Sequence, residues 1–359
     1  MTIPLFKVAM SPEAHYLVAD VLASGYIGQG QQVEAFEDAL QNLLELPYAP
    51  LTTNSCTSAL DLALHLIGVG PGDAVLTTPM TCTATNSPIV RRGAVPFWVD
   101  VDPWTGLIDP EKIEQAIWKA SINYRPTAIM AVDWGGAVCD YAALKEHGLP
   151  VIQDAAHHLS PPQGDYTAYS FQAIKFLTSG DGGALVAPAD QMERARLLRW
   201  YGLDRRSKAD FRCEQNISEV GYKYHLNDIA AAIGLANIGS VRELIAQHQA
   251  NAAYYNQHIE SYQVQRAPLD PDSACWLYTL LVKDRQGFIS HMADYGIACS
   301  PVHARNDQHT AFHFPNGPLP GVDYFASRNV AIPVGWWLTA DDRRRVVEAV
   351  QAWALSDAG

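Results

Sequence analysis

The chain has 359 residues, with 25 basic and 38 acidic side chains and a formal net charge of −13. Hydrophobic residues make up 48% of it and charged residues 18%, which is typical of a globular chain with a large core and excludes a disordered one. Nucleic acids and anionic membrane surfaces are bound by clustered Lys and Arg, so the acidic balance argues against both partners. At about 150 residues per domain, this length predicts two or three domains.

The sequence also predicts a soluble cytoplasmic protein. No stretch approaches the roughly 20 apolar residues that span a bilayer, and the first residues lack a basic leader followed by an apolar core. No two cysteines form a CxxC pair, which favours free thiols in a reducing compartment over disulfides or a structural zinc site. The cysteines are Cys56, Cys82, Cys139, Cys213, Cys275 and Cys299.

From about residue 20 to 235, short apolar runs alternate with helical patterns, which indicates a parallel sheet with crossover helices. The clearest helix runs from Thr57 to Ile67, where apolar residues recur at helical spacing. Asn54 and Ser55 are suitable caps for its start, and the glycine at 68 favours its end. The expected strands are Ala74–Thr77, Val95–Val99, Ala128–Val132, Val151–Gln153, Thr167–Phe171 and Ala184–Ala187.

After about residue 240 the pattern changes to that of an α+β unit. A long helical pattern covers Ser240–Tyr262, and a strand-like segment follows at Trp276–Val282. A loop rich in His, Asn and Pro occupies residues 301–320, and an amphipathic helix is expected over Thr339–Ala354.

A run of small hydroxyl and amide side chains, from Thr53 to Ala59, leads into the first clear helix. The free N–H groups and the positive end of the helix dipole would make a cradle for a phosphate group. Ser and Thr cap most helices without binding anything, so this run alone indicates only a helix start.

A carboxylate and two histidines follow an expected strand. Asp154 stands where the strand ends, at the edge where α/β proteins bind ligands, although a helix cap or a solvated turn would explain it equally well. Adjacent residues of a strand point to opposite faces, so His157 and His158 would rarely bind one metal ion together. We expect no metal site.

Lys175 follows the expected strand Thr167–Phe171 and precedes a glycine-rich turn. An unpaired buried ammonium is costly, so a lysine that points into a cleft usually has a partner or a function. Burial lowers the pKa of such a lysine and makes it a nucleophilic amine able to form a Schiff base. The alternative is a surface lysine whose stem covers apolar neighbours.

These three features have a common explanation. A pyridoxal phosphate site needs a lysine for the Schiff base, a carboxylate that keeps the pyridinium nitrogen protonated, and a helix start for the phosphate. The sequence offers them on an α/β framework in the order helix start, Asp154, Lys175. The combination predicts a pyridoxal phosphate enzyme.

Over nearly its whole length the chain resembles the DegT/DnrJ/EryC1/StrS aminotransferases, pyridoxal phosphate enzymes that aminate nucleotide-linked keto sugars. The motifs that carry the resemblance are Gly28-Gln29-Gly30, Ser55-Cys56-Thr57-Ser58-Ala59-Leu60, Gly70-Pro71-Gly72-Asp73, Asp154-Ala155-Ala156-His157, Ser170-Phe171 with Lys175, Gly180-Asp181-Gly182-Gly183, Gly221-Tyr222-Lys223-Tyr224 and Pro301-Val302-His303.

The resemblance implies an α/β protein of the type I aminotransferase fold, with a large mixed seven-stranded sheet domain and a smaller C-terminal α+β domain. We place the large domain, with an N-terminal arm, at residues 1–240 and the small domain at residues 241–359. The resemblance also implies a homodimer whose two active sites lie at the subunit interface.

The resemblance implies roles for single residues. Lys175 falls on the Schiff-base lysine, Asp154 on the partner of the pyridinium nitrogen, and His157 on the contact to the ring hydroxyl. The residues that fall on the phosphate site are Ser55, Cys56, Thr57 and Ser170.

The sequence departs from the family pattern at three positions of the expected cofactor site. Cys56 stands where glycine is usual, and Cys82 stands near where many members place an aromatic ring over the cofactor. Lys223 replaces an asparagine that in many members reaches the phosphate of the partner subunit. Lys223 could supply a cationic contact to that phosphate, and a structural role is an equal alternative.

The implied reaction is a transamination in two halves, with L-glutamate as amino donor and a nucleotide-linked keto sugar as acceptor. Freed Lys175 would move the proton between donor and cofactor. His303 falls on a position that the family uses near the substrate. The same loop offers Arg305, Asn306 and His309 as further contacts, although such loops are often only solvated.

Two alternatives remain. A dehydratase, lyase or aldolase could use the same cofactor on the same fold, but the dehydratases of the family replace the lysine with histidine, so Lys175 argues against that branch. A non-catalytic sugar-sensing regulator would need a DNA-binding or partner-binding module. The sequence shows no basic helix-turn-helix region.

Overall fold

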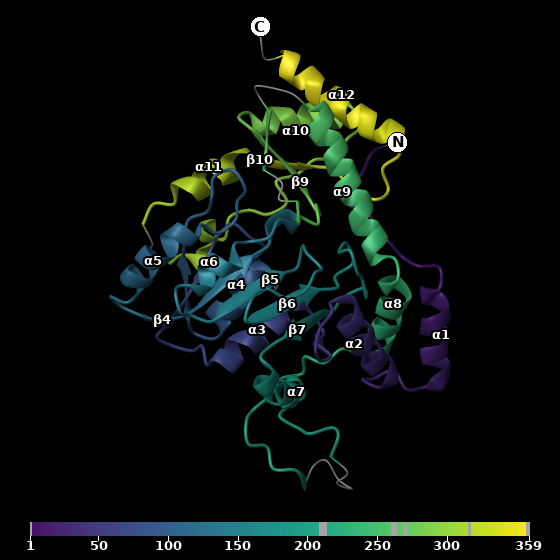
Figure 1. The fold of residues 1–359 in the computed structure, drawn as a ribbon, viewed down its shortest axis with the longest axis vertical. Helices are drawn as coiled ribbons and strands as arrows, with labels where there is room; N and C mark the ends of the chain where they lie inside the picture. The colour runs from purple at the N-terminus through teal and green to yellow at the C-terminus, as the bar shows by residue number, and fades with distance from the viewer. Residues whose placement is uncertain (1, 208–213, 260–263, 269–270, 315–316, 357–359) are drawn as a thin grey trace.

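The computed structural model describes residues 2–207, 214–259, 264–268, 271–314 and 317–356 (Figure 1). Its centre is a seven-stranded sheet in the order β1-β7-β6-β5-β4-β2-β3. Five neighbouring strands run parallel, and β7 runs antiparallel to both β6 and β1, so the sheet is mixed. The strands are β1 (Leu51–Thr53), β2 (Asp73–Thr77), β3 (Val95–Trp98), β4 (Arg125–Val132), β5 (Val151–Ala155), β6 (Tyr166–Ser170) and β7 (Gly183–Val186).

The alternating pattern located six of these strands, but the expectation that all of them run parallel is wrong for β7. Residues 171–182, which connect β6 to β7, contain no crossover helix, and two parallel neighbours need one. The strand β1 was missed because three residues are too few to show a period. The mixed sheet that the family resemblance implies is confirmed.

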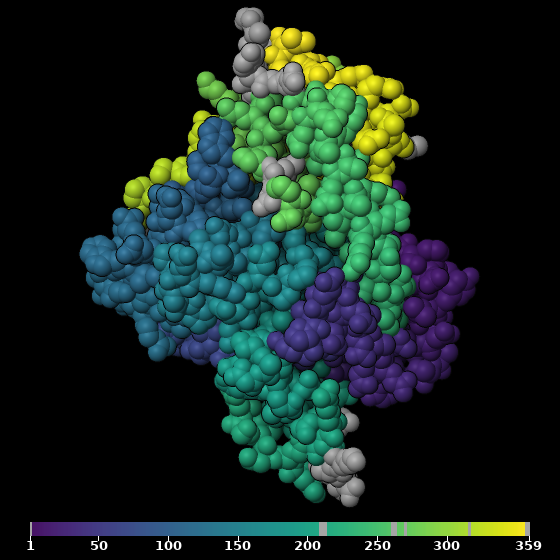
Figure 2. Space-filling view, in the orientation of Figure 1, coloured from purple at the N-terminus to yellow at the C-terminus, as the bar shows by residue number. Residues whose placement is uncertain are grey.

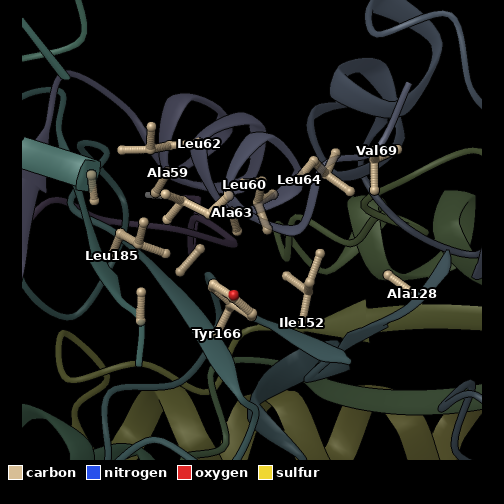
Figure 3. Close-up of a cluster of buried hydrophobic side chains, with 14 of the residues drawn as sticks. Ala59, Leu60, Leu62, Ala63, Leu64, Val69, Ala128, Ile152, Tyr166 and Leu185 are labelled. Carbon is tan, nitrogen blue, oxygen red and sulfur yellow. The ribbon is translucent and has the colours of Figure 1, made fainter. Parts of the chain in front are cut away.

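The helix α3 (Cys56–Ile67) lies on this sheet and begins and ends as the sequence predicts. The side chain of Ser55 caps it by accepting a hydrogen bond from the Ser58 N–H, and Gly68 ends it in the left-handed conformation with φ +86°. Leu60 and Leu64 pack against strand residues such as Ile152 (Figure 3). This packing fixes the start of α3 relative to the ends of the strands.

The other helices surround the two sheets (Figure 1). Helices α1 and α2 pack against α8. Short 3-10 turns lie at Trp134–Gly136 and Asn306–Gln308. The remaining helices are α1 (Ala14–Ser24), α2 (Gln31–Leu43), α4 (Thr83–Arg91), α5 (Ile113–Ala120), α6 (Tyr141–Lys145), α7 (Met192–Arg199), α8 (Asp228–Ile238), α9 (Val241–His258), α10 (Arg285–Asp294), α11 (Pro320–Arg328) and α12 (Ala340–Ser356).

A smaller antiparallel sheet, in the order β10-β9-β8, is formed by the C-terminal part of the chain. Its strands are β8 (Val264–Arg266), β9 (Tyr278–Val282) and β10 (Asn329–Ile332). Ile3 forms a bridge with Ile297 and lies in the core of this smaller sheet, so the N-terminal segment packs with the C-terminal part. The expected boundary near residue 240 falls between α8 and α9, and the division into two domains stays a prediction.

Some expected elements shift at their ends. The helix expected over Ser240–Tyr262 is α9, which ends at His258, and residues 260–263 lie outside the described part. Cys213 also lies outside it, and the other cysteines are free thiols.

Among the described residues no single helix is long and apolar enough to cross a membrane. Helices α8 and α9, which meet at a bend of 58°, together have the length and composition of a span.

The chain that follows α7 projects from the body at the end opposite the C-terminus (Figures 1 and 2). We call residues 200–224, without the undescribed 208–213, the projecting segment. Its two legs pair at the base, where Trp200 forms a bridge with Lys223. A Cβ atom at Gly221 would lie 2.3 Å from the backbone nitrogen of Gly202, so the legs approach too closely for a side chain there.

Candidate active site

Asp154 lies in β5, near the carboxyl end of this parallel strand, and is 3% exposed. Its Oδ2 accepts a hydrogen bond from the Thr85 hydroxyl at 2.8 Å, and its Oδ1 accepts one from the Ala156 N–H at 3.1 Å. Burial raises the pKa of Asp154, whereas these hydrogen bonds and the charge of Lys175 lower it. The site therefore contains a buried carboxylate held in place from two sides.

Lys175 lies in the loop after β6, and its ammonium points inward. The residue as a whole is only partly buried, but its Nζ lies 3.7 Å from the ring centroid of Trp276, which is 4% exposed. Burial lowers the pKa of Lys175 from its usual 10.5 to about 8, and the charge of Asp154 opposes that change. The alternative of a lysine stem lying on the surface with its ammonium in water is therefore wrong.

His157 stacks on the same indole, with 4.0 Å between the ring centroids and 17° between the planes. Its Nδ1 accepts a hydrogen bond from the Gly135 N–H at 3.2 Å, which assigns its proton to Nε2. Burial and the charge of Lys175 hold the pKa of His157 well below its usual value, so the ring is neutral near pH 7. A neutral ring with a free Nε2–H is a hydrogen-bond donor to an oxygen.

His303 completes an aromatic cluster beside these residues. Its ring lies 5.9 Å from that of His157 and nearly parallel to it, and Trp134 meets both rings edge-on. Burial lowers the pKa of His303 to about 4. Within the described ranges, neither His303 Nε2 nor Trp134 Nε1 has a hydrogen-bond partner, although both atoms are buried. Such orphaned polar atoms fit a site that receives a polar ligand.

Three segments converge at the start of α3. Ser170 ends β6 and pairs with Gly183 of β7, and a Cβ at Gly183 would lie 2.5 Å from the backbone nitrogen of Cys56. The side chain of Ser55 accepts a hydrogen bond from the Ser58 N–H, whereas the first N–H groups of the helix, at Cys56 and Thr57, have no acceptor within the helix. The glycine that allows close approach here is Gly183, while the family pattern puts one at position 56.

The two cysteines of the predicted cofactor site differ in their surroundings. Cys56 is buried, its Sγ lies 3.8 Å from Asp154 Oδ1, and burial raises the pKa of its thiol well above the usual value. It is therefore a neutral side chain packed on the carboxylate and not a nucleophile. Cys82 is partly exposed and occupies the N-cap of α4 without a capping hydrogen bond from its side chain.

Lys223 lies on the projecting segment and is exposed. Its backbone carbonyl accepts a hydrogen bond from Asn54 Nδ2 at 3.2 Å, so the lysine leaves the body beside the start of α3. Its contact to a phosphate stays a prediction.

The four predicted substrate residues lie in different surroundings in the structure. Arg305 is paired with Asp307 and Asp323, so its charge is already matched within the chain. Asn306 is fully buried, and its side chain bonds to Asn86 and to the Thr81 carbonyl, which anchors the loop. His309 is exposed, and only His303 joins the aromatic cluster. Substrate contacts by the other three residues stay predictions.

Sequence reasoning missed Thr85, Trp134 and Trp276. Trp134 follows the end of β4, at the same sheet edge as Asp154, so the edge rule could have found it. Nothing in the sequence connects Trp276 to this edge, because it comes from the C-terminal part of the chain.

In the part of the chain that the structure describes, no group of three or more His, Cys, Asp or Glu residues could hold a metal ion.

The sequence and the fold are similar to those of known sugar aminotransferases. Residues 9–351 match the model of the DegT/DnrJ/EryC1/StrS aminotransferase family. The crystal structure of AtS13 from Actinomadura melliaura is similar, with a TM-score of 0.91 and 39% identity over 98% of each chain. The sugar aminotransferase CalS13 from Micromonospora echinospora gives a TM-score of 0.89 and 38% identity over 98% of this chain and 99% of that one.

Among curated proteins, the spore coat polysaccharide biosynthesis protein SpsC of Bacillus subtilis is 29% identical in an alignment of 365 positions that covers 93% of this chain and 92% of SpsC. Aminotransferases of this family use pyridoxal phosphate. The chain therefore belongs to the DegT/DnrJ/EryC1/StrS aminotransferase family and is a pyridoxal-phosphate-dependent sugar transaminase.

Proposed function

We propose that this enzyme transfers the amino group of L-glutamate to a nucleotide-linked keto sugar in the cytoplasm and releases an amino sugar. The observation that carries the proposal is the juxtaposition of a partly neutral amine, Lys175, with the hydrogen-bonded carboxylate of Asp154 at one buried sheet edge. The family membership supports a sugar substrate and an amino donor, and the keto group, the nucleotide linkage and glutamate are our proposal.

The residues present fit pyridoxal phosphate. The N–H groups at the start of α3, which have no acceptor within the helix, suit a phosphate, and the side chains of Ser55, Thr57 and Ser170 lie nearby. Asp154 suits a pyridinium nitrogen, and the Nε2–H of His157 suits a ring oxygen. When bound, the cofactor supplies an aldehyde that joins the lysine amine and a ring that accepts an electron pair.

The chain's own groups have distinct tasks in this proposal. Lys175 moves the proton: with a pKa of about 8, its amine can accept and return a proton near neutral pH. Asp154, which is buried, holds a negative charge opposite the pyridinium nitrogen. His303, with its orphaned Nε2, is our choice for the group that orients the sugar or the donor carboxylate.

We further propose that the enzyme works as a homodimer joined through the projecting segment. Val220 of this segment is 82% exposed and Ile217 is 47% exposed, so the segment carries two apolar side chains that a second subunit would cover. Glu219 holds the base of the segment to the body through Arg194 and His65. Lys223 would then reach the phosphate of the partner's cofactor.

Replacing Lys175 by Ala should abolish transamination, since the amine both binds the cofactor and moves the proton. We expect glutamate-dependent release of 2-oxoglutarate to fall by about 10²–10⁴-fold or more. The matched control is Lys119→Ala, an exposed lysine on α5, which should keep normal activity. Near-normal turnover by Lys175→Ala would refute the assigned role.

With the wild-type enzyme loaded with pyridoxamine phosphate, a panel of nucleotide-linked 3- and 4-keto sugars would identify the acceptor by return of the pyridoxal absorbance.

Replacing Thr85 by Val should weaken the reaction without unfolding the chain, because it keeps the volume and removes the hydroxyl that donates to the Asp154 carboxylate and contacts the Thr81 hydroxyl. A hydrogen bond to a charged group contributes about 1.5–3 kcal/mol, so kcat/KM should fall roughly 10- to 150-fold. Thr83→Val, on the exposed side of the same helix start, should leave kcat/KM unchanged. Equal kinetics for the two variants would show that Asp154 does not depend on this bond.

The reactivity of Lys175 should follow its lowered pKa. In the cofactor-free enzyme, the fraction of neutral amine should rise about tenfold per pH unit up to a midpoint near pH 8 and level off above it, because only the neutral amine reacts. Brief acylation at a series of pH values, followed by mass spectrometry of the peptides, measures this reactivity. A Lys175 midpoint at or above its usual 10.5 would contradict the burial of the amine.

A charge on the projecting segment should disrupt the dimer. We expect Val220→Asp to increase the monomer fraction in sedimentation velocity at micromolar concentration and to weaken pyridoxal phosphate binding, since the partner's Lys223 would be lost. Leu355→Asp, an equally exposed change on α12, is the control and should do neither. A wild-type enzyme that is active and monomeric would refute the proposed assembly.

A further inference from the structure

Trp276 is held at the active site by contacts with both parts of the chain. It lies just before β9 of the smaller sheet, and the backbone on either side of it, at Ala274 and Leu277, donates hydrogen bonds to the glycine pair 135–136 of the large part. Its indole N–H donates to the carbonyl of Ile174, the residue before Lys175, at 3.2 Å. The ring therefore has one fixed orientation at the sheet edge.

This indole contacts two residues of the proposed catalytic machinery. The ammonium of Lys175 lies 3.7 Å from its centroid, and the ring of His157 stacks on it at 4.0 Å. Phe6 of the N-terminal segment adds a further stacked ring at 5.0 Å, with 24° between the planes. One side chain thus orders the lysine and the histidine together.

The ammonium depends on this ring because it has no ion pair in the residues that the structure describes. The titratable groups that interact electrostatically with the ammonium are Asp154, Cys56, Cys82, His157 and His303. Of these only Asp154 is a carboxylate, and it acts on the lysine without direct contact. A cation over an indole face is stabilised by the negative face of the ring, most strongly where water is excluded.

We propose that Trp276 is the positioning residue of Lys175: its indole face holds the ammonium group whenever the amine is not joined to the cofactor, and the same ring fixes the plane of His157. The proposal rests on the proposed role of Lys175 as the cofactor-binding lysine. It explains how a flexible four-carbon side chain keeps one place at the moments when it carries the proton.

The test is the pH midpoint of Lys175 acylation in the cofactor-free protein, compared between wild type and Trp276→Leu. The indole stabilises the charged form, so its removal should lower the midpoint by about 0.5–1.5 pH units, as expected for a cation–π contact of a partly or fully buried cation. Trp276→Phe keeps a weaker aromatic face and should give a smaller downward shift. In the loaded enzyme, both changes should lower kcat more than they raise KM.

A matched control is available on the same part of the chain. Trp336 lies under a different lysine, Lys7, at 5.2 Å, so Trp336→Leu should leave the Lys175 midpoint where it is in the wild type. A shift of equal size in this control would attribute the effect to general loosening of the fold. An unchanged or raised midpoint in folded Trp276→Leu would overturn the proposal.

If Trp276→Leu does not fold, a fluorinated tryptophan at position 276 tests the same contact between the indole face and the ammonium. Fluorine keeps the shape and withdraws charge from the ring face, so the midpoint should fall as fluorine atoms are added, and a constant midpoint would overturn the proposal. The readout needs no cofactor and no sugar. Failure of Lys175→Ala to abolish turnover would instead reject the proposed function, so the two results are distinguishable.

Discussion

The structure depends on burying a carboxylate and an amine near each other, at the edge where parallel strands end. Each charged form is costly to remove from water, and the chain compensates the two in different ways. Asp154 receives donors from Thr85 and the backbone, whereas Lys175 receives an aromatic face and the field of the carboxylate. The pKa of the carboxyl group rises and that of the ammonium falls, so both groups titrate nearer neutrality than they would in water.

The arrangement of the backbone makes this edge possible. Helix α3 is fixed on the sheet by its leucines, and its first turn faces the end of β6 and the reversed strand β7. At Gly183 the strand lies against the helix start with no room for a side chain. The proposed phosphate site therefore depends on packing between segments more than 100 residues apart, and the capping residues by themselves would not create it.

The sequence was most informative where a local pattern and a general rule coincide. The caps of α3, six strands of the large sheet, and Asp154 at a strand end all follow from spacing and the edge rule. The direction of β7 does not, because direction is set by how the chain returns after β6 and not by the residues of β7. The aromatic cluster was also beyond reach, since Trp276 meets Lys175 only through contacts between distant parts of the chain. The bonds of the Asn306 side chain to Asn86 and to the Thr81 carbonyl were also out of reach of the sequence, because these partners lie more than 200 residues away along the chain.

The N-terminal segment lies closer to the reaction centre than its position in the sequence suggests. Phe6 stacks on the indole that carries the lysine, and Ile3 is bound into the core of the smaller sheet. A purification tag, a dye or a surface tether fused ahead of these residues would pull on the aromatic stack from outside. Attachment after α12, whose Leu355 is 78% exposed, leaves that stack untouched, so immobilised or labelled preparations of the enzyme should be built from that side.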